Sequence, residues 1–153
     1  VLAKGLASGY PISAVLFREE LGSWPPGAHG TTFGGQAVAA AAAHATLDLL
    51  EGGLQENAAR LGEFLLAELR ALKRRFPFLG DVRGRGLMIG LDFGDPDHPQ
   101  PDLRDKAVRL AFEKGLLLLP AGPSALRIAP PLVLTQEEAA LGLEILEEVF
   151  RAL

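Results

Sequence analysis

The sequence predicts an α/β fold in which helices pack on a small sheet. Segments with helical periodicity alternate along the chain with short apolar segments, an order typical of α/β domains. Of the 153 residues, 48% are hydrophobic and 22% are charged, so the chain carries enough apolar material for a packed core. The 18 glycines and 11 prolines indicate many turns between the segments.

The first third of the chain contains two turn-rich stretches and one helix. Glycine and proline punctuate the start, where Lys4 lies just before a glycine turn, and the apolar residues Ile12 to Phe17 predict a strand. The stretch from Gly22 to Gly35 is rich in glycine, proline, serine and threonine, which indicates an ordered loop or a linker. Alanine and leucine dominate from Gln36 to Glu51 and predict a helix that stops at the glycine pair 52–53.

Three further helices are expected downstream. Leucines and alanines recur at three- and four-residue spacings from about Leu54 to Arg75, which predicts an amphipathic helix. A second helix is expected from Asp102, which can cap it, to Lys114. Thr135 and Glu138 have the spacing of a capping box and predict the start of the last helix.

Short apolar runs between these helices predict the strands of the sheet. They are Leu87 to Phe93, Leu116 to Leu119 and Ala125 to Ala129. A glycine and proline turn at residues 120–124 separates the last two, and Pro130 with Pro131 ends the third.

Composition and charge exclude several classes of protein. Nineteen acidic against fifteen basic side chains give a net charge of −4, so no broad basic surface for nucleic acid is expected. The longest apolar run, which contains Val38 to Ala43 and begins at Ala37, is far shorter than the roughly 20 residues of a membrane span. The chain has no cysteine, which removes disulfides and thiol catalysis and fits a cytoplasmic protein, the location we expect.

Spacing also excludes some common sites. The three histidines, His29, His44 and His98, lie far apart in the sequence, so no metal site is expected. The glycines between Gly84 and Gly90 miss the dinucleotide-binding fingerprint by one residue, and they precede a strand where the fingerprint follows one. A tight turn into a core strand explains them.

Three sets of polar residues remain as candidates for chemistry. Lys4 is either a solvated side chain or an amine that attacks an aldehyde to form a Schiff base. Thr31 and Thr32, in a glycine-rich loop before a helix, are either plain loop residues or ligands for a phosphate group. Arg127 lies on an otherwise apolar strand and is either exposed on its outer face or directed inward toward an anion such as a substrate carboxylate.

Taken in order, these segments resemble the class III pyridoxal-phosphate-dependent aminotransferases, the family of the ornithine, acetylornithine and 4-aminobutyrate enzymes. Leu2 to Pro11, followed by Ala14 and Val15, resembles the family's cofactor-lysine segment. His29 to Gly35 is similar to its phosphate loop, although Gln36 and Ala37 stand where the family usually has Asn-Pro. The further matching segments are Val82 to Met88 and Leu126 to Leu132.

The resemblance assigns a role to each candidate. It implies that Lys4 forms the Schiff base with pyridoxal 5'-phosphate, and that Thr31 and Thr32 contact the phosphate of a cofactor held mainly by the partner subunit of a homodimer. It also implies that Arg127 holds the substrate's carboxylate. The implied reaction is transfer of an amino group from an amino acid, a 4-aminobutyrate-like or ornithine-type omega-amino donor, to a 2-oxo acid.

Members of this family are much longer than the chain, and residues that bind the rest of the cofactor precede the lysine. Because the chain opens at Val1 in an apolar stretch, we expect the front of a longer protein to be missing. The resemblance implies a fold-type I enzyme, with residues 1–51 as the end of the large cofactor-binding domain and 52–153 as the small C-terminal α/β domain. The alternative is a truncated, non-catalytic piece that folds or self-associates without cofactor.

Overall fold

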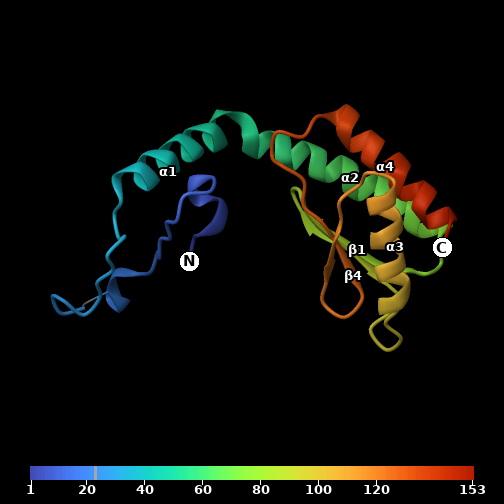
Figure 1. Ribbon diagram of the computed structural model, residues 1–153, viewed down its shortest axis with the longest axis horizontal. Coiled ribbons are helices and arrows are strands. Elements are labelled where there is room, and N and C mark those ends of the chain that lie inside the picture. Colours follow the sequence, from blue (N-terminus) through green and yellow to red (C-terminus); the bar gives the residue numbers. More distant parts are fainter. Residues whose placement is uncertain (23) are drawn as a thin grey trace. The chain divides into compact units, whose positions relative to one another are not determined.

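The computed structural model describes residues 1–22 and 24–153, so Ser23 of the predicted loop from Gly22 to Gly35 lies outside the described residues. The chain divides into two compact units, residues 1–53 and 54–153 (Figure 1). Within the described residues, no helix is long and apolar enough to cross a membrane.

The first unit is built from helix α1 (Ala37–Leu49) and two 3₁₀ helices, η1 (Lys4–Ala7) and η2 (Glu19–Leu21). Helix α1 packs against η1. The helix predicted from Gln36 to Glu51 is confirmed to within two residues, and a wide turn, η3 (Leu50–Leu54), links it to α2. Gly53 in that turn has φ 125°, a backbone conformation that favours glycine.

The strand predicted from Ile12 to Phe17 is wrong for this structure. A single bridge forms there, in which the Leu2 N–H donates to the Ala14 carbonyl at 2.7 Å and the Ala14 N–H returns a bond to Leu2 at 2.9 Å. A strand needs a neighbouring strand along its length to satisfy its backbone groups, and within the described part of unit 1 the bridge to Leu2 is the only β pairing that this segment makes.

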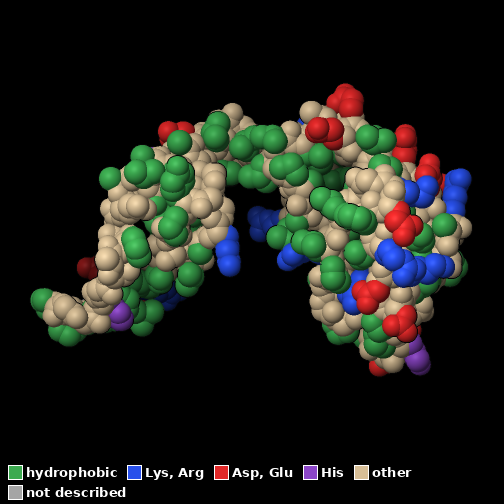
Figure 2. All heavy atoms as spheres, viewed as in Figure 1, with side chains coloured by type: hydrophobic (Ala, Val, Ile, Leu, Met, Phe, Trp, Pro, Cys, Tyr) green, Lys and Arg blue, Asp and Glu red, His purple; other side chains and the backbone are tan. Residues whose placement is uncertain are grey.

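The first unit leaves many large apolar side chains exposed. They include Val15, Leu16, Phe17, Trp24 and Phe33, each with more than two fifths of its surface accessible. Figure 2 shows the contrast on one face, where most charged side chains lie over the second unit and the first carries mainly hydrophobic and uncharged atoms.

The second unit is a four-stranded antiparallel sheet with three helices. The strands are β1 (Leu79–Arg85), β2 (Met88–Phe93), β3 (Leu119–Ala121) and β4 (Ala125–Ile128), in the order β1-β2-β4-β3. The helices are α2 (Gln55–Arg75), α3 (Pro101–Glu113) and α4 (Gln136–Arg151). The α/β fold class predicted from the sequence is confirmed.

One face of this sheet makes the core of the unit. Ile89, Leu91 and Phe93 alternate along β2 and are at most 1% exposed, and they join one apolar cluster with the buried residues of α2, α3 and α4. Phe93 and Phe150 belong to a group of four phenylalanine rings whose centroids lie 5.6–6.0 Å apart. The intervening β2 residues Met88, Gly90 and Asp92 are directed to the other face.

The strands predicted from Leu87 to Phe93 and from Ala125 to Ala129 are confirmed to within one residue as β2 and β4, and the helix expected from Asp102 to Lys114 is confirmed as α3. The helix from about Leu54 to Arg75 is confirmed, whereas β1 was not predicted and β3 starts at Leu119, not at Leu116. Helix α3 starts with Pro101 in its first turn and has no side-chain cap, so the capping role expected for Asp102 is wrong.

The capping box that starts α4 is confirmed. The Glu138 N–H donates to Thr135 Oγ1 at 3.2 Å, and the Thr135 N–H donates to Glu138 Oε2 at 2.8 Å. These bonds from Thr135 hold the pKa of the Glu138 carboxyl below its ordinary value. The bonds satisfy two donors at the helix end that would otherwise lack partners.

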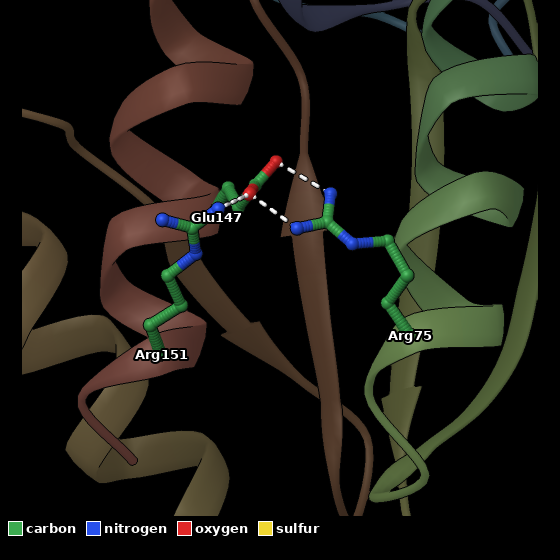
Figure 3. A network of polar contacts seen from close by, with 3 residues as sticks. All are labelled: Arg75, Glu147 and Arg151. Carbon is green, nitrogen blue, oxygen red and sulfur yellow. Dashed lines mark hydrogen bonds and ion pairs between the residues drawn. The ribbon is translucent and has the colours of Figure 1, made fainter.

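Glu147 of α4 lies between two arginines (Figure 3). Arg75, the last residue of α2, donates from Nη1 to Oε2 at 2.8 Å and from Nη2 to Oε1 at 2.5 Å, and Arg151 adds a bond from the same helix. The hydrogen bond to Arg75, followed by the charges of the two arginines, lowers the pKa of the Glu147 carboxyl. This network joins the C-terminal ends of α2 and α4.

Two helical glycines should respond in opposite ways to a methyl group. A Cβ on Gly142 of α4 would meet only Leu116 Cδ1 at 3.9 Å, beside an apolar cavity of about 100 Å³, so Gly142→Ala should raise the free energy of unfolding by about 1 kcal/mol. A Cβ on Gly62 of α2 would lie 2.5 Å from the Gly86 carbonyl carbon, so Gly62→Ala should lower it by about 2 kcal/mol. Urea unfolding of both variants tests this, and equal effects would contradict the packing described.

The Glu147 network predicts a pH dependence of stability. Because the folded-state pKa of Glu147 is lowered, its contribution is complete above the ordinary value of 4.5 and is lost as the pH falls through the folded-state value. The Glu147→Gln variant should therefore lose less stability than the parent on acidification. Thermal melts between pH 7 and pH 3, with Glu63→Gln of α2 as a control outside the network, measure the difference. Parallel curves for the parent and Glu147→Gln would exclude the contribution.

Candidate functional site

Lys4 begins the short helix η1 with an unusual backbone conformation. Its φ is 59° and that of Ser8, just after the helix, is 47°, both in the left-handed region that few non-glycine residues adopt. Its side chain is exposed, and across residues 1–22 and 24–153 no hydrogen bond or ion pair engages its ammonium group. The amine is therefore accessible to a reactant.

The turn around Lys4 is anchored on helix α1. Ala7 is fully buried, and Ser8 Oγ lies 3.0 Å from Thr46 Oγ1 of α1. Thr46 in turn donates to the Ala42 carbonyl at 2.8 Å. These contacts fix the C-terminal side of the turn, so the position of Lys4 depends on α1. This helix follows the glycine-rich loop that contains Thr31 and Thr32, called the threonine loop below.

The threonine loop is a series of tight turns ahead of α1. The Gly34 N–H donates to the Thr31 carbonyl at 3.2 Å and the Gln36 N–H to the Phe33 carbonyl at 3.3 Å. Gly35 has φ 71°, which a β-branched residue would tolerate poorly. Both threonines are exposed, as a ligand-binding role requires.

A surface depression of about 390 Å³ connects this loop with the segment that follows the lysine turn. It is lined by Pro11, Ile12, Ser13, Thr31, Phe33, Gly34 and Gly35. Thr31 is part of its wall, whereas Thr32 and Lys4 are not. Within the first unit the structure thus brings Thr31 close to the Pro11 segment and leaves the Lys4 amine outside this depression.

Arg127 lies in the second unit, on β4, opposite Gly90 of β2 and Leu119 of β3. Its neighbours Leu126 and Ile128 are directed to the core face, so the period of two places Arg127 on the open face of the sheet. Its side chain is exposed. Of the two orientations that the sequence left open, outward and inward, the structure therefore has the outward one. No hydrogen bond or ion pair engages it anywhere in the described ranges of the chain.

Sequence reasoning missed a charged cluster on the same face. Arg83 of β1 donates to Asp92 of β2 through both Nη atoms, at 3.0 Å for Nη2 to Oδ1, and to Asp81 at 3.1 Å. Hydrogen bonds to Asp92 first, and then to Asp81, raise the pKa of the Arg83 guanidinium. The alternation of Asp81, Arg83 and Arg85 along one strand was the available signal, but β1 was not recognised as a strand.

The described residues contain no candidate metal centre. Nowhere in residues 1–22 and 24–153 do three or more His, Asp or Glu side chains gather in a way that could hold an ion. The chemistry offered is that of a primary amine, a hydroxyl pair and a guanidinium.

Comparison with known proteins defines the class. The family model for aminotransferase class-III matches residues 1–150, and the chain therefore belongs to the class III aminotransferases. The resemblance stated from its motifs is confirmed.

The individual relatives are longer enzymes. The chain is 44% identical over 154 residues to the acetylornithine aminotransferase of Gloeobacter violaceus, covering 99% of this chain and 37% of that protein. It is 41% identical over 155 residues to an alanine/serine racemase of Pyrococcus horikoshii, covering 99% of this chain and 33% of the relative. The chain thus spans about a third of the length of the curated relatives it matches.

A solved structure is similar over nearly the whole chain. It is an amine transaminase from an uncultivated Pseudomonas species, crystallised in its pyridoxal-phosphate-bound form. The match has a TM-score of 0.85 at 37% identity and covers 98% of this chain and 37% of that one. The α/β fold described above is accordingly shared with aminotransferase structures.

The left-handed backbone at Lys4 predicts a gain of stability when the lysine is replaced by glycine. A side chain in this conformation costs about 1 kcal/mol, so Lys4→Gly should unfold at higher urea concentration than Lys4→Ala. The fluorescence of Trp24, the only tryptophan, reports on the first unit and provides the measurement. If Lys4→Ala proved the more stable of the two, the backbone at Lys4 would not be strained.

Proposed function

We propose that this chain is the part of a pyridoxal-phosphate-dependent aminotransferase that carries the cofactor-binding lysine, one phosphate loop and the carboxylate-binding arginine. The longer protein would transfer an amino group from an amino acid to a 2-oxo acid. The observation that carries the proposal is the match to aminotransferase class-III over residues 1–150, which includes Lys4, Thr31, Thr32 and Arg127.

The residues at these positions fit pyridoxal phosphate chemically. An aldehyde needs an unpaired amine, and the ammonium of Lys4 is exposed and has no partner in the described part of the chain. A phosphate needs hydroxyl and N–H donors beside small residues, and Thr31 and Thr32 stand in an exposed glycine loop before a helix. When bound, the cofactor withdraws electrons from the substrate carbon and so eases loss of its proton.

Lys4 would serve as both anchor and base. Its amine would hold the cofactor before the substrate arrives, and once the substrate's amino group has displaced it, the same Nζ would take the proton from the substrate carbon and deliver it to the cofactor. The contacts of Ala7 and Ser8 with α1 fix the turn from which this side chain extends.

Arg127 would bind the substrate. A guanidinium holds a carboxylate with two parallel hydrogen bonds, which orients the substrate as well as attracting it. On the open face of the sheet Arg127 has no partner within the described residues, so its donors are available for that carboxylate.

The threonine loop favours a homodimer with a shared site. Thr31 and Thr32 would contact the phosphate of the cofactor held mainly by the partner subunit. The separation of the Thr31 depression from the Lys4 amine supports this division of roles, as do the exposed apolar side chains of unit 1.

We assign residues 1–51 to the end of the large cofactor-binding domain and 52–153 to the small C-terminal domain. The division into compact units at residues 53 and 54 supports this assignment. For the amino donor we propose an omega-amino compound of the 4-aminobutyrate or ornithine type. The similarity of the chain to a G. violaceus protein named acetylornithine aminotransferase supports the ornithine type.

Racemisation is a second candidate reaction. The P. horikoshii relative, named an alanine/serine racemase, is 41% identical to the chain. Removal of the proton from the substrate carbon by a lysine is common to both reactions, and delivery of a proton to the same carbon by a donor on the opposite face inverts an amino acid. Assays should therefore include both keto-acid formation and inversion of alanine.

The test uses a hybrid enzyme in which this chain replaces the matching segment of the G. violaceus acetylornithine aminotransferase. With pyridoxal phosphate the hybrid should turn yellow, and borohydride should fix the cofactor on Lys4, as read by peptide mass spectrometry. Lys4→Ala should abolish both signals and reduce turnover by at least about a hundredfold, the usual contribution of a general base. Lys73→Ala, an exposed lysine of α2, is the matched control and should change neither.

Two outcomes would overturn the proposal. Retention of a borohydride-reducible chromophore in Lys4→Ala would place the cofactor elsewhere. A folded hybrid without colour would favour the alternative of a truncated, non-catalytic piece that folds or self-associates without cofactor. We expect the isolated 153-residue chain to lack useful activity.

A further inference from the structure

Three strands, β1, β2 and β4, place Arg83, Gly90 and Arg127 in one row across the open face of the second unit's sheet. Arg83 of β1 is the register partner of Gly90 of β2, and Gly90 is the partner of Arg127 of β4. Because residues two apart on a strand share a face, Asp92 of β2 lies on the same face, next to this row. Two cations and one carboxylate thus surround a glycine.

Arg83 extends across Gly90 to reach that carboxylate. A Cβ on Gly90 would be 3.9 Å from both Cγ and Cζ of Arg83, so the arginine side chain lies over the glycine. Its Nη1 donates to Asp92 Oδ2 and its Nη2 to Asp92 Oδ1, the latter at 3.0 Å. Both carboxylate oxygens of Asp92 are therefore engaged, and only 28% of its side chain is exposed.

Without Arg83, the same carboxylate would have another partner within reach. Asp92 is opposite Ala125 and Arg127 is opposite Gly90, so Asp92 and Arg127 are diagonal neighbours on adjacent antiparallel strands. Diagonal neighbours are about 7–8 Å apart at the backbone, a distance that a long arginine side chain spans. Gly90 has no side chain and the Arg83 side chain lies over it, so removal of that side chain would open the space between Asp92 and Arg127.

We propose that Arg83 is a positioning residue for Arg127, because by binding Asp92 it prevents an Asp92–Arg127 ion pair and keeps the Arg127 guanidinium free for a carboxylate ligand. Asp81 supports this role by accepting a bond from Arg83 at 3.1 Å, which holds the guanidinium on the β1 side of Gly90. The inference rests on the proposed role of Arg127 and adds a specific partner to it. Loss of Arg83 affects substrate binding only through Asp92.

A double-mutant cycle in the hybrid enzyme tests this dependence. Arg83→Met should raise the KM for the amino-acid substrate about threefold, the strength of an exposed ion pair, with kcat nearly unchanged. Asp92→Asn alone should leave KM within error of the parent. The double variant Arg83→Met with Asp92→Asn should recover the parental KM, because no carboxylate remains to occupy Arg127.

Two further variants separate this effect from loss of charge or of structure. Arg85→Met removes another exposed cation from the same face of β1 and should not change KM. Arg83→Lys keeps a cation near Asp92 and should restore most of the affinity. The threefold effect should also shrink at high salt, which weakens exposed ion pairs and would not alter a packing defect.

The outcomes are distinguishable from failure of the proposed function. If Arg127→Lys leaves KM unchanged in the hybrid, the carboxylate role of Arg127 is wrong. If Arg127→Lys raises KM but Arg83→Met does not, only the positioning role fails. An equal rise in KM for Arg83→Met and for the double variant would also overturn it, because Asp92 would then have no part in the effect.

Discussion

The two-residue period of strands β2 and β4 is the constraint on which the second unit depends. It directs Ile89, Leu91 and Phe93 into the core, where α2, α3 and α4 cover them, and it directs the alternate residues to the open face. A slip of one residue would exchange the two sets and bury Asp92 and Arg127 without partners. The burial of three large apolar side chains on one strand therefore fixes the face on which Arg127 lies on the next.

The first unit uses a different means to hold Lys4, the residue for which we propose a reactive role. Lys4 is in a short helix and not on a strand, and its turn is fixed by the packing of Ala7 and the Ser8–Thr46 contact with α1. A strained backbone at an accessible amine is typical of residues retained for chemistry and not for stability. The alanine content of α1 fits this arrangement, because small side chains allow the turn to approach closely.

Charge on the open face is organised by pairing. Arg83 and Arg127 share a row, but Arg83 has two carboxylate partners and Arg127 has none in the described part of the chain. Glu147 shows the same principle at the ends of α2 and α4, where one carboxylate binds two arginines. Of the two arginines in this row, Arg127 is the one whose guanidinium is not engaged by a carboxylate among the described residues.

The sequence by itself determined the helices, the residue types of the site and the family. Helical spacing and the capping box depend on residues close in the chain, so α2 and the start of α4 could be read directly. Tertiary structure decided what depends on distant residues: that β1 is a strand, that Ile12 to Phe17 is not one here, and that Arg127 is exposed while Arg83 is paired. Strand pairing joins residues far apart in the sequence, and only the folded sheet sets their register.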